Sequence, residues 1–120
     1  MSKKVLVLGA SPNPDRYSNR AIRLLRRYGH EVMALGMRKG EVAGIPIHQE
    51  LNETEDIHTV TLYLGPNNQH GYYKLLQEIK PRRVIFNPGT ENEELQALLQ
   101  ENGIQVIENC TLVMLNNEMF

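Results

Sequence analysis

Several residue types are scarce in this 120-residue chain, and each absence narrows the classes of protein to which it can belong. Cys110 is the only cysteine, so no disulfide can form within the chain. There is no tryptophan, and aromatic residues make up only 6% of the sequence, with no basic and aromatic stripe of the kind that stacks on bases. The formal net charge is −1, so no bulk charge attracts a nucleic acid or an anionic membrane. We therefore expect neither as a partner.

Long apolar runs are also missing, and none approaches the length of a transmembrane helix. The first four residues run directly into an expected strand, which leaves no apolar core for a signal peptide, so we expect a cytoplasmic protein. The composition, 41% hydrophobic and 22% charged, is ordinary for a globular protein. The length suits one domain with a sizeable core, and we expect residues 1–120 to form it.

What the chain does contain is an alternation of strand-like and helix-like stretches. Short apolar runs at residues 5–8, 31–35, 59–64, 84–86 and 104–107 read as strands, and residues 45–47 as a very short edge strand whose direction stays open. Apolar residues recur at helical spacing in 21–28, 72–79 and 95–99. The alternation predicts an α/β fold, a doubly wound, mostly parallel sheet of five or six strands with helices on both faces.

Polar residues and glycines mark the expected helix ends. Ser18 or Asn19 is a candidate cap for the first helix, and Thr90 followed by Glu93 predicts a capping box before the last long one. Gly29 and Gly103 are expected to end these two helices. Pro81 is expected to close the helix between them.

Glycine or proline stands at four expected strand ends: Gly9, Gly36, Gly65–Pro66 and Pro88–Gly89. A doubly wound sheet binds ligands at the carboxyl ends of its strands, where small residues let a ligand approach the backbone. After Gly9, a polar loop leads into a helix, and a helix start favours an anion such as a phosphate. The alternative is that these are ordinary turns, which need glycine and proline in any protein.

The sequence around the first two strands bears on which nucleotide would bind. The first turn lacks the G-x-G-x-x-G pattern of an NAD site, and no carboxylate follows the second strand. Arg38 and Lys39 stand there instead, and two cations favour a phosphate on the ribose. NADP and coenzyme A both carry such a phosphate. The alternative for these two residues is a solvated turn.

Residues 7–18, with their GASP loop, resemble the opening of the small single-domain CoA-binding proteins. Those proteins are similar to the CoA-binding domain of the succinyl-CoA synthetase alpha subunit. The likeness continues through residues 42–47, 60–64, the NPGTENEE stretch at 87–94, and 108–110, so it covers nearly the whole chain. It implies a Rossmann-like domain that binds coenzyme A or an acyl-CoA.

The resemblance also implies which residues would line the site. The phosphates would lie in the loop after the first strand, with the ribose phosphate or adenine near the cations after the second strand and the remaining wall made by later strand ends. The cofactor-binding residues expected on this basis are Gly9, Ala10, Ser11, Arg16, Tyr17, Ser18, Gly36, Arg38, Lys39, Leu64, Gly65, Pro66, Pro88 and Gly89.

We find no catalytic constellation and no metal-ligand spacing in the sequence. The four histidines are scattered, and Ser11 has no base partner or G-x-S-x-G setting, so we interpret it as a hydrogen-bond donor to phosphate. Cys110 precedes a short apolar segment that would form a helical turn. It is either an inert, partly buried cysteine or a thiol that forms a mixed disulfide with CoA.

Three functions remain open at this point. The first is a non-enzymatic module that binds CoA or acyl-CoA. The second is an NADP-binding, oxidoreductase-like domain, although a substrate domain and a catalytic pair are both missing. The third is a regulatory or protein-interaction domain that keeps the fold without a ligand.

Overall fold

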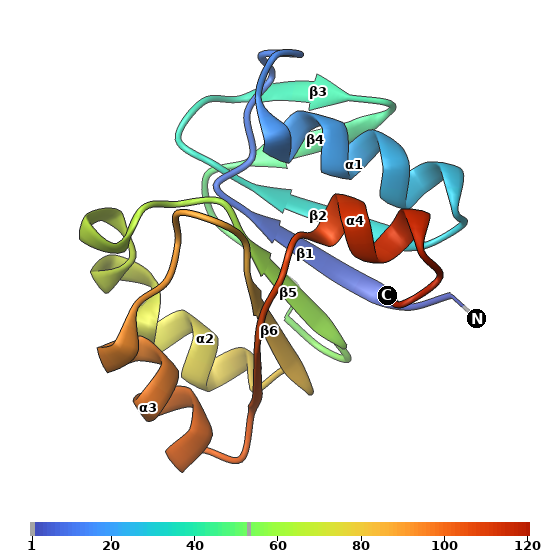
Figure 1. Cartoon of the computed structure of the whole chain (residues 1–120). Helices are drawn as coiled ribbons and strands as arrows, with labels where there is room; N and C mark the ends of the chain where they lie inside the picture. Colours follow the sequence, from blue (N-terminus) through green and yellow to red (C-terminus); the bar gives the residue numbers. More distant parts are fainter. Residues whose placement is uncertain (1, 53) are drawn as a thin grey trace.

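The computed structural model describes residues 2–52 and 54–120, and Figure 1 shows the path of the chain. Two short 3-10 helices, η1 and η2, precede α2. The elements are, in chain order, β1 (Lys4–Leu8), α1 (Tyr17–Arg27), β2 (Glu31–Leu35), β3 (Gly40–Val42), β4 (Ile45–His48), β5 (Thr59–Leu62), η1 (Pro66–Asn68), η2 (His70–Tyr72), α2 (Tyr73–Ile79), β6 (Arg83–Phe86), α3 (Glu93–Glu101), β7 (Gln105–Glu108) and α4 (Thr111–Asn116).

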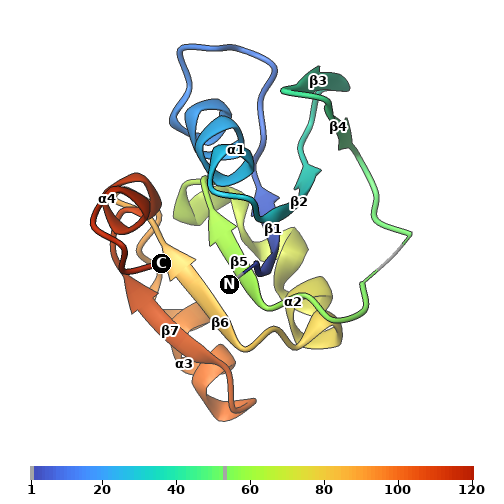
Figure 2. The ribbon, with the colours of Figure 1, turned by 90° about the vertical axis from the view of Figure 1, so that its right-hand side faces the viewer.

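The strands form one sheet in the order β3-β4-β2-β1-β5-β6-β7. All neighbours pair in parallel except β3 and β4, which are antiparallel. Helices α1 and α4 cover one face of the sheet, and α2 and α3 cover the other (Figures 1 and 2). The predicted α/β fold with a mostly parallel sheet is confirmed. The predicted strand number is wrong, because the described residues form seven strands and not five or six.

The additional strand is β3, which has only three residues, two of them exposed. Its strand geometry comes from a tight hairpin with β4, in which Ala43 and Gly44 both have positive φ, 50° and 82°. Two positive φ values in a row are typical of the turns that join antiparallel strands. The strand at 45–47 is therefore not at the edge. Pro46 is tolerated because β4 pairs with β2 only through Ile47 and His48.

The strands alternate their apolar side chains between two cores. In β1, Val5 and Val7 face α1 and α4, whereas Leu6 and Leu8 face α2 and α3. All four are at most 1% exposed, as expected for a parallel strand covered on both sides. The larger core lies under α2 and α3 and includes Phe86. These two cores hold the carboxyl ends of the strands in fixed relative positions.

The carboxyl ends of the helices lie where the sequence predicts them, whereas the predicted amino-terminal caps differ from the observed ones. Gly29 and Gly103, with φ of +82° and +76°, directly follow the C-cap residues of α1 and α3. Lys80 ends α2 in the left-handed region, next to Pro81.

The predicted N-caps are wrong for both long helices. Arg16 holds the cap position of α1 without a side-chain hydrogen bond, because Ser18 and Asn19 are buried inside the first turn. Asn92 caps α3, accepting from the N–H of Leu95, because the Thr90 hydroxyl donates instead to the carbonyl of Asn87. The capping box is therefore not formed.

Candidate functional site

The sheet reverses its direction of winding between β1 and β5. From β1 the chain passes through α1 to β2 on one side, whereas β5, β6 and β7 lie on the other side of β1. The loops that leave the carboxyl ends of β1 and β5 therefore diverge, and such a reversal is where doubly wound sheets bind their ligands. Figure 2 shows the loop after β1 rising above this edge of the sheet before it enters α1.

The first residues after β1 are packed into the fold. The backbone N–H groups of Gly9 and Ala10 both donate to the carbonyl of Leu35, each at 2.9 Å. Gly9 has a φ of +95°, and a Cβ at this position would lie 3.0 Å from Leu64. Gly9 thus packs directly against Leu64, in the loop after β5. The amides of Gly9 and Ala10 are engaged within the protein, and a phosphate would need other donors.

Two further glycines allow this loop to lie on the connection between β2 and β3. A Cβ on Gly36 would collide with the carbonyl oxygen of Ala10, and a Cβ on Gly40 would lie 2.8 Å from Pro12. Glycine is needed at both positions because the Ala10 carbonyl and the Pro12 ring occupy the space that a side chain would take. The predicted site residue Gly36 therefore supports the loop.

The start of α1 offers the unengaged donors. Among the described residues, no hydrogen bond uses the backbone N–H groups of Ser11, Tyr17 or Ser18. The first turn of α1 has no acidic residue, and the Arg16 side chain is exposed beside it. The Asn19 side chain donates to the carbonyl of Ser11 at 3.0 Å and so fixes the loop against the helix. Free amides at a positive helix end can hold an anion.

The predicted cations lie on the β2 side of this loop. Arg38 and Lys39 are exposed in the connection between β2 and β3. Lys39 lines a hollow of about 460 Å³ whose other lining residues are Gly40, Ile47, His48, Gln49 and Glu50. Because Pro12 packs on Gly40, this hollow borders the loop after β1.

A smaller cavity of about 100 Å³ lies on the other side of the start of α1. Its lining residues come from the start of α1, from the segments after β5, β6 and β7, and from α4. They are Tyr17, Tyr63, Asn87, Pro88, Cys110 and Leu112. Of these, only Tyr17 and Pro88 are among the binding residues predicted from the sequence. Tyr63, Asn87 and Leu112 were missed, and Cys110 was singled out only for its thiol.

Asn87 connects three elements around this cavity. Its side-chain N–H₂ group donates to the Thr61 hydroxyl at 2.7 Å and to the Leu62 carbonyl at 2.8 Å. Its side-chain oxygen accepts from the backbone N–H of Thr111 at 2.9 Å, and the hydroxyls of Thr61 and Thr111 lie 2.8 Å apart. Asn87 is 3% exposed, so these bonds are formed away from water. These hydrogen bonds therefore join β5, β6 and α4 in one wall of the cavity.

Tyr63 contributes a buried polar group beside the Asn87 network. Its hydroxyl oxygen makes no hydrogen bond of standard geometry among the described residues, but the side chains of Thr61 and Thr111 lie close enough to offset part of the pKa shift that burial causes. Burial raises the pKa of Tyr63 to about 12, because the phenolate would lose its hydration. At neutral pH this hydroxyl is consequently a protonated donor.

The remaining predicted residues lie in two loops that are tied together. The Gln69 side chain, which is buried, donates to the carbonyls of Leu64 and Thr90, at 2.9 and 2.7 Å. This holds the Leu64–Gly65–Pro66 segment beside the loop after β6. Within that second loop, the N–H of Gly89 donates to the Glu91 carboxylate at 2.8 Å, so this amide is also engaged.

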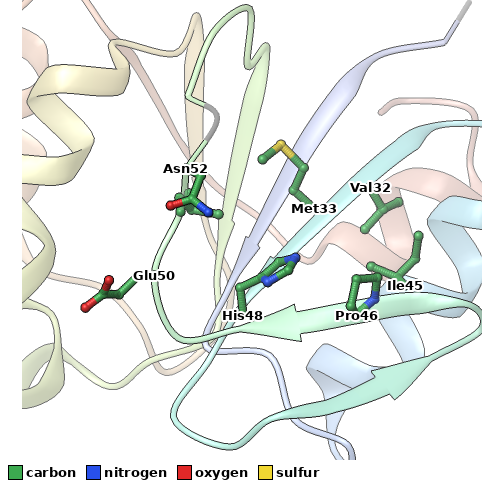
Figure 3. Close-up of a pocket in the computed structure, with 8 residues that line it drawn as sticks. Val32, Met33, Ile45, Pro46, His48, Glu50 and Asn52 are labelled. Carbon is green, nitrogen blue, oxygen red and sulfur yellow. The ribbon is translucent and has the colours of Figure 1, made fainter.

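Another concave region of about 310 Å³ lies between β2, β4 and the segment after β4 (Figure 3). Val32 and Met33 come from β2, and Ile45, Pro46 and His48 from β4. None of the residues predicted to bind a ligand lines it. Within residues 2–52 and 54–120, no three histidine, cysteine or acidic side chains are grouped so that they would hold a metal ion. No helix in this part of the chain is long and apolar enough to cross a membrane.

Comparisons with known proteins identify the family to which this chain belongs. The protein family described as a CoA binding domain matches residues 3–116. A solved structure described only as an uncharacterized protein is 49% identical, with 100% of this chain and 99% of that chain covered and a TM-score of 0.97. No curated protein matches the sequence.

Two more distant structures share the fold. A protein from Thermus thermophilus is 23% identical over 99% of this chain and 91% of its own, with a TM-score of 0.85. The dinucleotide-forming acetyl-coenzyme A synthetase 1 of Ca. Korarchaeum cryptofilum is 18% identical. It matches 89% of this chain with 25% of its own length, at a TM-score of 0.69.

Proposed function

This chain belongs to the family of CoA binding domains, and we propose that it binds coenzyme A or an acyl-CoA as a non-catalytic module at the carboxyl edge of its sheet. The observation that carries the proposal is the family match over residues 3–116, nearly the whole chain. The geometry supports it, because the reversal between β1 and β5 is flanked by a free helix start and two concave regions.

The diphosphate would bind at the start of α1. The free N–H groups of Ser11, Tyr17 and Ser18 would donate to its oxygens, and the exposed Arg16 guanidinium would pair with its charge. The Ser11 hydroxyl accepts from the N–H of Asn13 at 3.1 Å, which leaves its own proton free to donate to phosphate. In this arrangement Gly9 and Ala10 shape the loop, and their neighbours make the polar contacts.

The adenosine end would occupy the hollow beside Lys39. Ile47 and Gly40 line this hollow and provide a surface against which a flat base can lie. Arg38 and Lys39 would face the phosphate on the ribose, whose charge matches theirs. Leu64, Gly65, Pro66, Pro88 and Gly89 would form the wall on the β5 and β6 side.

A thermal-shift comparison of CoA, dephospho-CoA, NADP and NAD at equal concentration tests the proposed function. A ligand that binds only the folded state raises the melting temperature by mass action. We expect the largest shift with CoA and a smaller one with dephospho-CoA, which lacks the ribose phosphate. A shift with NADP alone would favour the oxidoreductase-like alternative. No shift with any of the four would favour a domain that acts through a protein partner.

A further inference from the structure

The 100 Å³ cavity and the Lys39 hollow lie on opposite sides of the start of α1. In the sheet, β2 and β4 lie on one side of β1, and β5, β6 and β7 lie on the other side. The hollow is on the side of β2 and β4. A ligand whose adenosine occupies the hollow and whose diphosphate meets α1 therefore continues toward β5 and β6. Tyr17, the first residue of α1, lines the cavity on that side.

We propose that this cavity receives the sulfur end of coenzyme A and restricts the bound acyl group to about two carbons. This inference rests on the proposed function and adds to it the class of acyl-CoA that the protein accepts.

The volume of the cavity sets the size limit. One water molecule takes about 30 Å³ of liquid, so a cavity of this size holds only a few non-hydrogen atoms. The sulfur and an acetyl group together fill that space, and an eight-carbon chain exceeds it. The cavity cannot widen easily on the Asn87 side, where hydrogen bonds join β5, β6 and α4.

The chemistry of the lining residues suits a small apolar group. The Tyr63 hydroxyl oxygen is buried near the side chains of Thr61 and Thr111, so the Tyr63 ring, and not its hydroxyl, faces the cavity. Among the other lining residues, Cys110 and Leu112 offer a weakly polar and an apolar surface. Leu112 is the residue whose truncation would enlarge the cavity without removing a hydrogen bond.

Calorimetric titrations of the full chain with CoA, acetyl-CoA, octanoyl-CoA and adenosine 3′,5′-bisphosphate test this inference. The bisphosphate contains the adenosine end and lacks the arm that carries the sulfur. We expect CoA and acetyl-CoA to bind with similar affinity and octanoyl-CoA to bind at least about 10-fold more weakly. Equal affinities for acetyl-CoA and octanoyl-CoA would overturn the inference.

Two variants test whether the effect arises in the cavity. Leu112→Ala should raise the affinity for octanoyl-CoA about 10-fold and leave the affinity for the bisphosphate unchanged. Val113 is the next residue of α4 and is exposed, so Val113→Ala should change neither affinity. An unchanged affinity of Leu112→Ala for octanoyl-CoA would contradict the assignment of this cavity.

The titrations also separate the two proposals. If neither CoA nor the bisphosphate binds, the proposed function and the inference both fail. If the bisphosphate and all three CoA compounds bind without regard to chain length, the proposed function is retained and only the assignment of the cavity fails.

Discussion

The side-chain oxygen of Asn87 accepts a hydrogen bond of 2.9 Å from the backbone N–H of Thr111. Thr111 is the first residue of α4, and its own hydroxyl lies 2.8 Å from that of Thr61 in β5. One buried amide thus attaches the last helix to the two strands that end at the candidate site. The position of α4, and with it the wall of the 100 Å³ cavity, depends on this residue.

Replacing Asn87 by alanine should destabilise the protein by about 2–4 kcal/mol. The change leaves the N–H of Thr111 and the carbonyl of Leu62 buried without their partner. Urea denaturation measures the loss. Asn116→Ala is the matched control, since Asn116 is exposed in α4, and it should change the free energy of unfolding by no more than about 0.5 kcal/mol. A small effect of Asn87→Ala would show that the network is not important for stability.

Gly36→Ala should be destabilising by about 1–3 kcal/mol and should also weaken CoA binding. The added methyl group would meet the carbonyl oxygen of Ala10, so the loop after β1 or the end of β2 must move. Gly71→Ala serves as the control because a Cβ there has no atom within 4 Å and the backbone conformation suits any residue. Thermal melts and CoA titrations of both variants check the expectation. Equal stability of the two variants would contradict it.

Arg16→Ala should weaken the binding of CoA about 5- to 10-fold without lowering the melting temperature of the free protein. Arg16 is exposed at the start of α1, and its side chain makes no cap hydrogen bond, so folding does not depend on it. The control is Arg26→Ala, at the other end of the same helix, which should leave the affinity within about 2-fold. Calorimetry measures both. The same loss in both variants would indicate a general charge effect and not a contact with phosphate.

Protonation of His30 should make the protein less stable in mild acid. His30 is buried, and its Nδ1 accepts the backbone N–H of Lys3 at 3.0 Å. Burial, followed by the charges of Lys3 and Arg83, lowers the pKa of His30 below its ordinary value of 6.5. Because the unfolded chain binds the proton more readily, the stability is complete above pH 6.5 and falls as the pH drops toward the lower folded-state pKa.

Urea denaturation at about pH 7.5 and about pH 5 measures this dependence. The His30→Asn variant keeps a side-chain acceptor near Lys3 without a titrating group, so it should lose less stability between the two pH values than the unmodified protein. Part of the dependence should remain, because burial and the charge of Arg83 also lower the pKa of His58. His70→Asn, at an exposed position, should behave like the unmodified protein. An unchanged pH dependence in His30→Asn would contradict the assignment.

The succession of strands and helices along the chain, and the mostly parallel sheet that it implies, could be predicted because buried strands and amphipathic helices have periodic apolar patterns. The pattern fails for Gly40–Val42, whose strand geometry comes from pairing with β4 and not from its own side chains. It also fails where a polar residue is used for tertiary contacts. Asn19, predicted as a cap, holds the carbonyl of Ser11, and Thr90 binds the carbonyl of Asn87.

The sequence predicted binding residues in the loop after β1 and did not predict most of the residues that line the 100 Å³ cavity. The loop after β1 contains glycine, proline and arginine close together in the sequence, so its role could be inferred locally. Tyr63, Asn87 and Leu112 are widely separated along the chain and meet only through the pairing of β5 with β6 and the packing of α4. The resemblance implied that Gly9 and Ala10 lie in the loop that holds the phosphates, and only the structure shows that the carbonyl of Leu35 accepts a hydrogen bond from the backbone N–H of each.

An NMR titration of the isotope-labelled protein with CoA is the most direct check of where CoA binds, because each backbone amide reports on its own surroundings. We expect saturable shifts of Ser11, Tyr17, Ser18 and Gly40, around the start of α1 and the Lys39 hollow, and little change in the exposed residues of α3 on the opposite face of the sheet. No shifts on adding CoA, or shifts confined to α3, would contradict the claim that the protein binds CoA at the carboxyl edge of its sheet.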